Sequence, residues 1–125
     1  MLGESELICF SATKNPKSAK EYYERTLGLK LVEDSPYAIV FDAGGTMLRI
    51  QKVEEYRPAN CTILGWKVSD IRMKMDQLAK RGVTFERYEG VPQDELGIWR
   101  IPGGAQIAWF KDPDGNTLSL TQWPS

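Results

Sequence analysis

Apolar residues in the first half of the chain form short runs separated by one stretch of helical spacing. The runs at residues 7–10, 29–33, 37–42 and 47–52 have the length and composition of β-strands. Between the first two runs, the apolar side chains recur every three or four residues, at Ala19, Tyr22, Tyr23 and Leu27. The pattern therefore predicts a strand, a helix and three further strands, in that order.

Cap and turn residues mark the ends of these elements. Asn15 and Pro16 are typical of the start of a helix, and Gly28 is typical of the residue just after one. Gly44 and Gly45 predict a tight turn between the last two strands.

The second half repeats this order. Strands are predicted at residues 61–68, 83–88, 106–111 and 117–122. The helix lies between the first two of them, with Asp70 as its N-cap, Gly82 after its end and an apolar stripe of Ile71, Met75, Leu78 and Ala79. Residues 89–104 contain several prolines and glycines and are predicted to form a loop or lid.

The agreement between the halves indicates an internal duplication. Gly28 and Gly82 are about 54 positions apart, and the caps Asn15 and Asp70 are about 55 apart. We therefore predict an α+β fold of two tandem βαβββ units in a single domain, with unit one at about 6–53, a connector at 54–60 and unit two at about 61–123.

Composition narrows the classes of function. The net charge of -1 gives no reason to expect a nucleic-acid or membrane partner, and the apolar runs are too short to cross a bilayer. The first six residues lack the features of a signal peptide, so we expect a cytoplasmic protein with reduced, buried thiols at Cys9 and Cys61. The chain has no histidine, which removes the commonest metal ligand and general base.

The last strand follows the turn Asp112-Pro113-Asp114-Gly115-Asn116. Pro113 fixes its own φ angle, Gly115 or Asn116 supplies a positive φ, and Asp112 can bond the turn backbone. These residues are predicted to be structural rather than to touch a ligand.

The segment from Phe110 to Gln122, which contains this turn, resembles the closing signature of the vicinal oxygen chelate superfamily. The pair Tyr22-Tyr23 and the helix exit Leu27-Gly28 are similar to features of the same family. The superfamily includes glyoxalase I, bleomycin-resistance proteins, fosfomycin-resistance enzymes and extradiol dioxygenases. The resemblance implies that the two units curl into an open trough, and that two chains pair as a homodimer.

Metal-dependent members of that family carry one ligand on the first and last strand of each unit. The resemblance places these positions at Ile8, Arg49, Ile63 and Ser119. Divalent metals require imidazole, carboxylate or thiolate ligands, and the guanidinium of Arg49 would repel a dication. We therefore expect neither a metal nor another cofactor.

Strand alternation places further side chains on the trough side. We expect a small organic molecule to bind there, with a carboxylate, phosphate or carbonyl end held by Arg49, although an ordinary ion pair of Arg49 with a nearby acid is equally consistent with the sequence. Trp66 and Trp109 are expected in the core, whereas Trp99 and Trp123 could cover the trough or a dimer contact. The predicted ligand-binding residues are Arg49, Ser119, Gln51, Thr121, Phe10, Met47, Lys67 and Trp99.

Three functions follow from these observations. The first is metal-free sequestration of a small molecule, as in bleomycin resistance. The second is a glyoxalase-like lyase or isomerase with a relocated or absent metal site, for which no residue pair nominates a general base. The third is a non-catalytic structural or regulatory module, which predicts a trough filled by Phe10, Met47 and the tryptophans.

Overall fold

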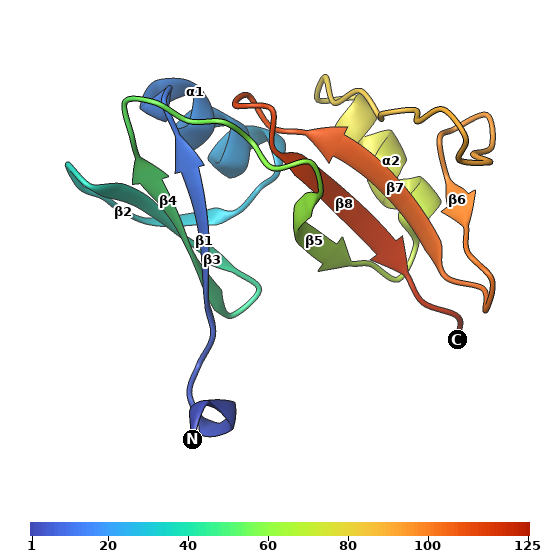
Figure 1. The fold of residues 1–125 in the computed structure, drawn as a ribbon, viewed down its shortest axis with the longest axis horizontal. Helices are drawn as coiled ribbons and strands as arrows, with labels where there is room; N and C mark the ends of the chain where they lie inside the picture. The colour runs from blue at the N-terminus through green and yellow to red at the C-terminus, as the bar shows by residue number, and fades with distance from the viewer. The chain divides into compact units, whose positions relative to one another are not determined.

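Each half of the chain folds into a four-stranded mixed sheet with a helix against one face (Figure 1). The computed structural model describes all residues, Met1–Ser125, and divides into unit 1, Met1–Arg57, and unit 2, Pro58–Ser125. The sheet orders β1-β4-β3-β2 and β5-β8-β7-β6 are equivalent, with the first and last strand of each unit paired in parallel. The predicted α+β fold of two repeated units is confirmed. No helix has both the length and the apolar character needed to cross a membrane.

Unit 1 contains the predicted strand–helix–three-strand order. After a 3₁₀ turn at Leu2–Glu4, its elements are β1 (Ile8–Thr13), α1 (Pro16–Glu21), β2 (Lys30–Asp34), β3 (Ala38–Ala43) and β4 (Thr46–Lys52). A π-helical turn, Tyr22–Thr26, continues α1. The helix ends before Gly28, whose φ of 76° is the left-handed conformation expected after a helix.

The core of unit 1 lies between the helix and one face of the sheet. Ala19 and Tyr23 are buried, and the Tyr23 ring packs on Phe41 of β3 with ring centroids 5.9 Å apart. Leu48 and Ile50 alternate along β4 on the same face as Phe41 and are also buried. The alternate residues of β1, β3 and β4 therefore form a second face without a covering helix from this unit, which we call open face 1.

The two helices begin differently. Asp70 accepts a hydrogen bond from the Met73 backbone N–H at 3.1 Å, as predicted for an N-cap. Asn15 occupies the N-cap position of α1, but its side chain makes no capping bond. Its backbone N–H instead donates to the buried Thr13 hydroxyl at 2.9 Å, which fixes the chain between β1 and α1.

Unit 2 has the same order, with a shorter edge strand. Its elements are β5 (Thr62–Lys67), α2 (Ile71–Ala79), β6 (Trp99–Arg100), β7 (Gln106–Lys111) and β8 (Thr117–Gln122). Phe110, Leu118 and Leu120 are buried on one face of the sheet. A hydrogen bond joins α2 to this face of the sheet: the backbone N–H of Ile71, at the start of the helix, donates to Oε1 of Gln122 in β8 at 2.8 Å. The other face of this sheet is open face 2.

The strand predicted at residues 83–88 is wrong. This segment contributes a single bridge from Phe85 to Phe110, and the fourth strand is the two-residue β6, which lies inside the segment predicted as a loop. After Phe85 the chain leaves the edge of β7. Its backbone groups form hydrogen bonds with the Gln93 side chain instead of a ladder with a neighbouring strand. Its Nε2 donates to the carbonyls of Glu86 (2.9 Å) and Gly97 (2.7 Å), and its Oε1 accepts from the Tyr88 N–H (2.8 Å).

The closing turn holds its shape through Asp112. The Asp112 carboxylate accepts hydrogen bonds from the backbone N–H of Asp114 (2.9 Å) and of Asn116 (3.0 Å), and from Nδ2 of Asn116 (2.8 Å). Gly115 supplies the positive φ, 85°, which resolves the alternative left open by the sequence. The predicted bonding of the turn backbone by Asp112 is confirmed.

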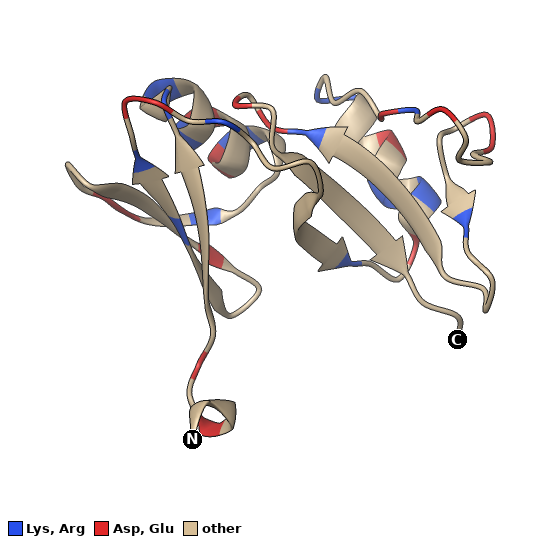
Figure 2. Cartoon of the chain, viewed as in Figure 1, with Lys and Arg blue, Asp and Glu red and all other residues tan.

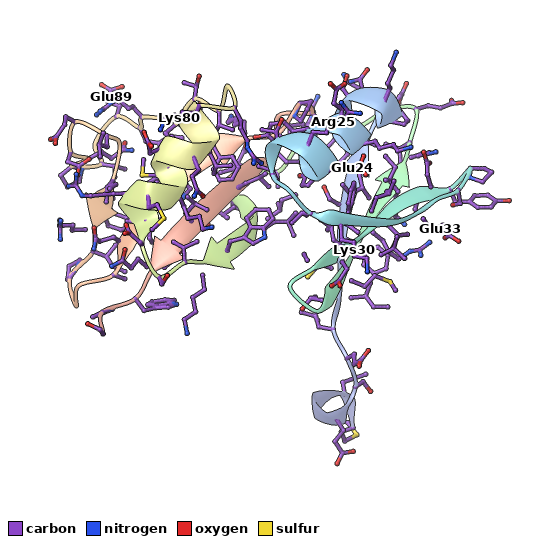
Figure 3. The ribbon with its side chains drawn as sticks, turned by 180° about the vertical axis from the view of Figure 1, so that it is seen from behind. Glu24, Arg25, Lys30, Glu33, Lys80 and Glu89 are labelled. Carbon is purple, nitrogen blue, oxygen red and sulfur yellow. The ribbon has the colours of Figure 1, made fainter.

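Charged residues lie mainly on the helices, the loops and the strand ends, while most of the sheet surface is uncharged (Figure 2). The edge strand β2 is an exception, because it carries Lys30 and Glu33 (Figure 3). Its Asp34 forms ion pairs with Lys52 (2.6 Å) and Lys20 (3.3 Å). The hydrogen bond from Lys52 is the main cause that lowers the pKa of the Asp34 carboxyl. Charges on an exposed edge disfavour pairing with strands of other molecules.

Candidate functional site

Four of the predicted ligand-binding residues share open face 1. The register of β1 on β4 pairs Phe10 with Arg49 and Ala12 with Gln51, and Ile8 with Met47, so these side chains project from the same side of the sheet. Phe10 is 53% exposed and Met47 is 41% exposed. Open face 1 therefore presents apolar side chains around a guanidinium.

Arg49 is not neutralised within its unit. It is half-buried on β4, opposite Phe10 on one side and Val40 on the other. None of the ion pairs in unit 1 involves it, and Asp42, which is on the same face, accepts the Gly45 N–H at 2.8 Å in the turn between β3 and β4. Unit 1 therefore does not contain the ordinary acidic partner that the sequence left as an alternative for Arg49.

An open pocket of about 520 Å³ lies beside Met47 on open face 1. Ile8, Val40 and Met47 line it from three neighbouring strands, and Val32 lines it from the edge strand β2. Its volume is in the range of small-molecule sites. Arg49 does not line the pocket but lies two residues from Met47 along β4 and on the same face, whereas Glu6 and Asp42 belong to the lining.

The remaining predicted ligand-binding residues share open face 2. Ser119 and Thr121 of β8 are paired with Gly65 and Lys67 of β5, and Trp99 reaches the same face through its pairing with Ile107 of β7. Ile63, the implied metal position on β5, lies at a bulge and has no partner in the register with β8.

Gly65 makes room for Ser119. A Cβ atom at position 65 would lie 2.8 Å from Oγ of Ser119, which is closer than carbon and oxygen atoms pack without displacement. Ser119 is only 7% exposed, although it lies on the open face between its cross-strand neighbours Gly65 and Trp109. The hydroxyl therefore sits low on the surface of the sheet.

The expectation for the tryptophans is half right. Trp66 is half-buried and packs on the buried Phe110 ring at 6.4 Å, which places it on the core side of the sheet. Trp109 is paired with Ser119 and is only half-buried, which places it on open face 2 rather than in the core. Its ring is stacked on Trp99 at 5.9 Å and meets the edge of Tyr88 at 5.4 Å.

Tyr88, Trp109 and Gln93 were not predicted as site residues from the sequence. Apolar residues occupy both faces of β7, so alternation alone could not tell which of Trp109 and Phe110 faces the helix. The pairing of Trp109 with Ser119 decides it, and this pairing is visible only once the register of β7 on β8 is known.

The loop that carries Tyr88 is held by several polar side chains, among them Arg87, which donates to the Glu95 carbonyl. Besides Gln93, the Asp94 carboxylate accepts the backbone N–H groups of Leu96 and Ile98, both at 2.9 Å, and pairs with Arg72 of α2 at 3.4 Å. Partial burial raises the pKa of Asp94, but the backbone donors and Arg72 outweigh it and leave this pKa lowered. The segment predicted as a loop or lid is therefore a bonded loop with an ordered connection to α2.

The four metal positions implied by the resemblance do not fit a metal ion. Ile8 and Ile63 offer no donor atom, Arg49 is cationic, and a lone Ser119 hydroxyl is a weak ligand. Within each unit, no group of three cysteine, aspartate or glutamate side chains is placed to hold a metal ion. No chemical step at these positions can therefore be assigned to a metal.

The sequence profile of the Glyoxalase/Bleomycin resistance protein/Dioxygenase superfamily matches residues 8–120, which is nearly the whole chain. The chain belongs to this superfamily. A comparison with curated proteins finds no match. Membership of the glyoxalase/bleomycin-resistance superfamily agrees with the two repeated units and with the closing signature around Asp112.

Several solved structures share the fold of this chain at low sequence identity. Lactoylglutathione lyase from Agrobacterium tumefaciens is 16% identical with a TM-score of 0.72, over 94% of this chain and 93% of that one. TioX from Micromonospora sp. ML1 is 17% identical with a TM-score of 0.73, over 96% and 99% of the two chains. TnmS3, an antibiotic binding protein from Streptomyces sp. CB03234, is 21% identical with a TM-score of 0.68, over 97% and 98%.

Proposed function

We propose that this protein binds a small organic molecule without the help of a metal, and that it acts by sequestration, as a resistance protein does. The observation that carries the proposal is Arg49, a guanidinium without an ion-pair partner in its unit, on a sheet face that also exposes Phe10 and Met47. An apolar wall with one cation suits a ligand that has an apolar body and a carboxylate, phosphate or carbonyl end. The likeness to TnmS3, an antibiotic binding protein, supports this class of function.

The exposed side chains on open face 1 favour binding over a purely structural role. A non-catalytic module was expected to pack Phe10 and Met47 inward, whereas about half of each side chain is exposed in the chain. Exposed apolar side chains on one sheet face are typical of a surface that is covered when a ligand or partner binds.

We further propose that the protein is cytoplasmic and forms a homodimer.

The titratable groups give less support to metal-free catalysis. A general base works best with a pKa near the working pH. The two carboxyl groups with displaced pKa values, Asp34 and Asp94, have them lowered, so both are weaker bases than an ordinary aspartate. Each of them already bonds lysine, arginine or backbone N–H groups.

Isothermal titration with adamantane-1-carboxylate tests the role of Arg49. This probe has an apolar body without an aromatic ring, and its methyl ester removes the charge. We expect the carboxylate to bind more tightly than the ester, and Arg49→Gln to weaken carboxylate binding roughly ten-fold because a charge-assisted bond is lost. Arg57→Gln is the matched control, since it removes the same charge from an exposed position outside the sheet.

A screen of glycopeptide, anthracycline-type and mitomycin-type drugs by tryptophan fluorescence complements this titration. At least one compound is expected to change the emission of the four tryptophans at micromolar concentration. Absence of any response in the screen, together with equal carboxylate binding by the wild type and Arg49→Gln, would overturn the proposal.

A further inference from the structure

Unit 2 contains more aromatic side chains than its core uses. Its first cluster packs half-buried Trp66 and Phe85 on Phe110, with ring centroids 6.4 and 5.7 Å from that ring, and Phe110 is 1% exposed. A second cluster, the stack Tyr88–Trp109–Trp99, lies on open face 2, where all three rings are only half-buried. Trp99 and Trp109 lie on the sheet face opposite the buried Phe110, and Tyr88 contacts Trp109, so this stack does not pack around Phe110.

The second cluster forms one side of an open pocket of about 390 Å³, which we call the aromatic pocket. This volume matches a small organic molecule of two or three fused rings. The pocket combines an apolar side with a polar side. Its apolar side consists of Tyr88, Val91, Trp99 and Trp109, and its polar side includes Asn60, Cys61, Thr62, Lys111 and Thr117.

The wall that carries Tyr88 is preformed. Gln93 bonds the backbone at Glu86, Tyr88 and Gly97, which fixes both ends of the loop that supplies Tyr88 and Val91. A preformed wall lowers the entropic cost of ligand binding.

Cys61, expected to be buried, is exposed and lies on the polar side of the pocket.

We propose that the aromatic pocket binds a flat aromatic ring system that carries an anionic oxygen group. The rings of Trp99 and Trp109 provide π surface for offset stacking, a contribution beyond apolar burial alone. Lys111, two residues from Trp109 along β7, adds a positive charge to the lining, and Thr62 and Thr117 add hydroxyl groups. The pocket lies entirely within unit 2, so it is distinct from the Arg49 face of unit 1.

Titration with anthraquinone-2-sulfonate tests this proposal, with cyclohexanesulfonate as the non-aromatic anion. The aromatic probe is expected to quench tryptophan emission and to bind at least about ten-fold more tightly than the aliphatic probe. Trp109→Leu and, separately, Trp99→Leu should each weaken aromatic binding roughly ten-fold. Trp123→Leu is the matched control, because Trp123 is exposed and outside the pocket.

Circular dichroism of each variant shows whether it is folded, and Thr117→Val tests the pocket without removing a ring. This isosteric change should weaken anthraquinone-2-sulfonate binding about three-fold, since it removes one hydroxyl partner. Equal binding by the wild type, Trp109→Leu, Trp99→Leu and Thr117→Val would overturn the proposal, and so would equal affinity for the two probes.

The Arg49→Gln variant separates this proposal from the proposed function. Retained anthraquinone-2-sulfonate binding in Arg49→Gln, with loss in Trp109→Leu, supports the aromatic pocket as a separate site. Loss in Arg49→Gln with retention in Trp109→Leu leaves the proposed function intact and overturns the aromatic pocket. Loss in both variants supports the pocket as an aromatic subsite but overturns its independence from Arg49.

Discussion

Replacing Asp112 with alanine is expected to lower the free energy of unfolding by about 3 kcal/mol, because the side chain accepts three hydrogen bonds in a buried turn. The loss falls mainly on Asn116, which is 0% exposed and whose amide Nδ2 would lose its carboxylate acceptor. Hydrogen bonds to a charged acceptor are worth more than neutral ones, and an unsatisfied buried donor carries its full desolvation cost. Urea unfolding followed by circular dichroism measures the change.

Two further variants sharpen this prediction. Asp112→Asn keeps one acceptor oxygen, so we expect it to be intermediate between the wild type and Asp112→Ala. Asp76→Ala is the matched control, because Asp76 forms only an exposed pair with Lys80 on α2 and should change stability by less than about 1 kcal/mol. A loss in Asp112→Ala no larger than that in Asp76→Ala would contradict the structural role of the turn.

Replacing Gln93 with alanine is expected to loosen residues 86–98 and to lower the free energy of unfolding by about 2 kcal/mol. The reason is the loss of three hydrogen bonds that join the Glu86, Tyr88 and Gly97 backbone across the loop. Amide hydrogen exchange should rise about ten-fold or more in this loop while α2 stays protected. Mass spectrometry of peptides from the two regions measures both rates.

Gln77→Ala provides the control for Gln93→Ala. Gln77 is exposed on α2 and makes no hydrogen bond through its side chain, so its replacement should leave exchange in the loop unchanged. Because Gln93 does not line the aromatic pocket, weaker binding of anthraquinone-2-sulfonate in Gln93→Ala would report on the position of the Tyr88 wall. Unchanged exchange at residues 86–98 in Gln93→Ala would contradict the role of Gln93 in holding the loop.

Local patterns were sufficient to predict most of the fold. The apolar stripe with Ala19 and Tyr23 correctly predicted the first helix. The positive φ angles of Gly28 and Gly115 confirm the predicted helix end and the predicted closing turn. These features depend on neighbours within a few residues, so the sequence alone expresses them. The repeat of the whole pattern then predicted the second sheet.

The failures come from contacts between distant residues. The apolar residues of 83–88 suggested a strand, but the side chain of Gln93 bonds this backbone and takes it away from the β7 edge. Likewise, Trp109 was expected in the core, because no local pattern shows that it is paired with Ser119 of the neighbouring strand β8. Side-chain bonds to the backbone and strand register are tertiary properties, and short-range propensities do not determine them.

Part of the candidate site could be predicted because it depends on local patterns. Alternation within one strand correctly grouped Met47, Arg49 and Gln51 on one face, and the register adds Phe10 from β1. The absence of an acidic partner for Arg49 within unit 1, and the pocket beside Met47, could be seen only in the structure.

The central claim is that ligand binding needs no metal, and one measurement tests it most directly. The protein is produced without a histidine tag in medium supplied with nickel, zinc, iron and manganese, and its metal content is measured by mass spectrometry. Adamantane-1-carboxylate binding is then titrated before and after treatment with a chelator. The account predicts far less than one metal ion per chain and the same dissociation constant in both titrations. One bound metal ion per chain, with binding abolished by its removal, would contradict it.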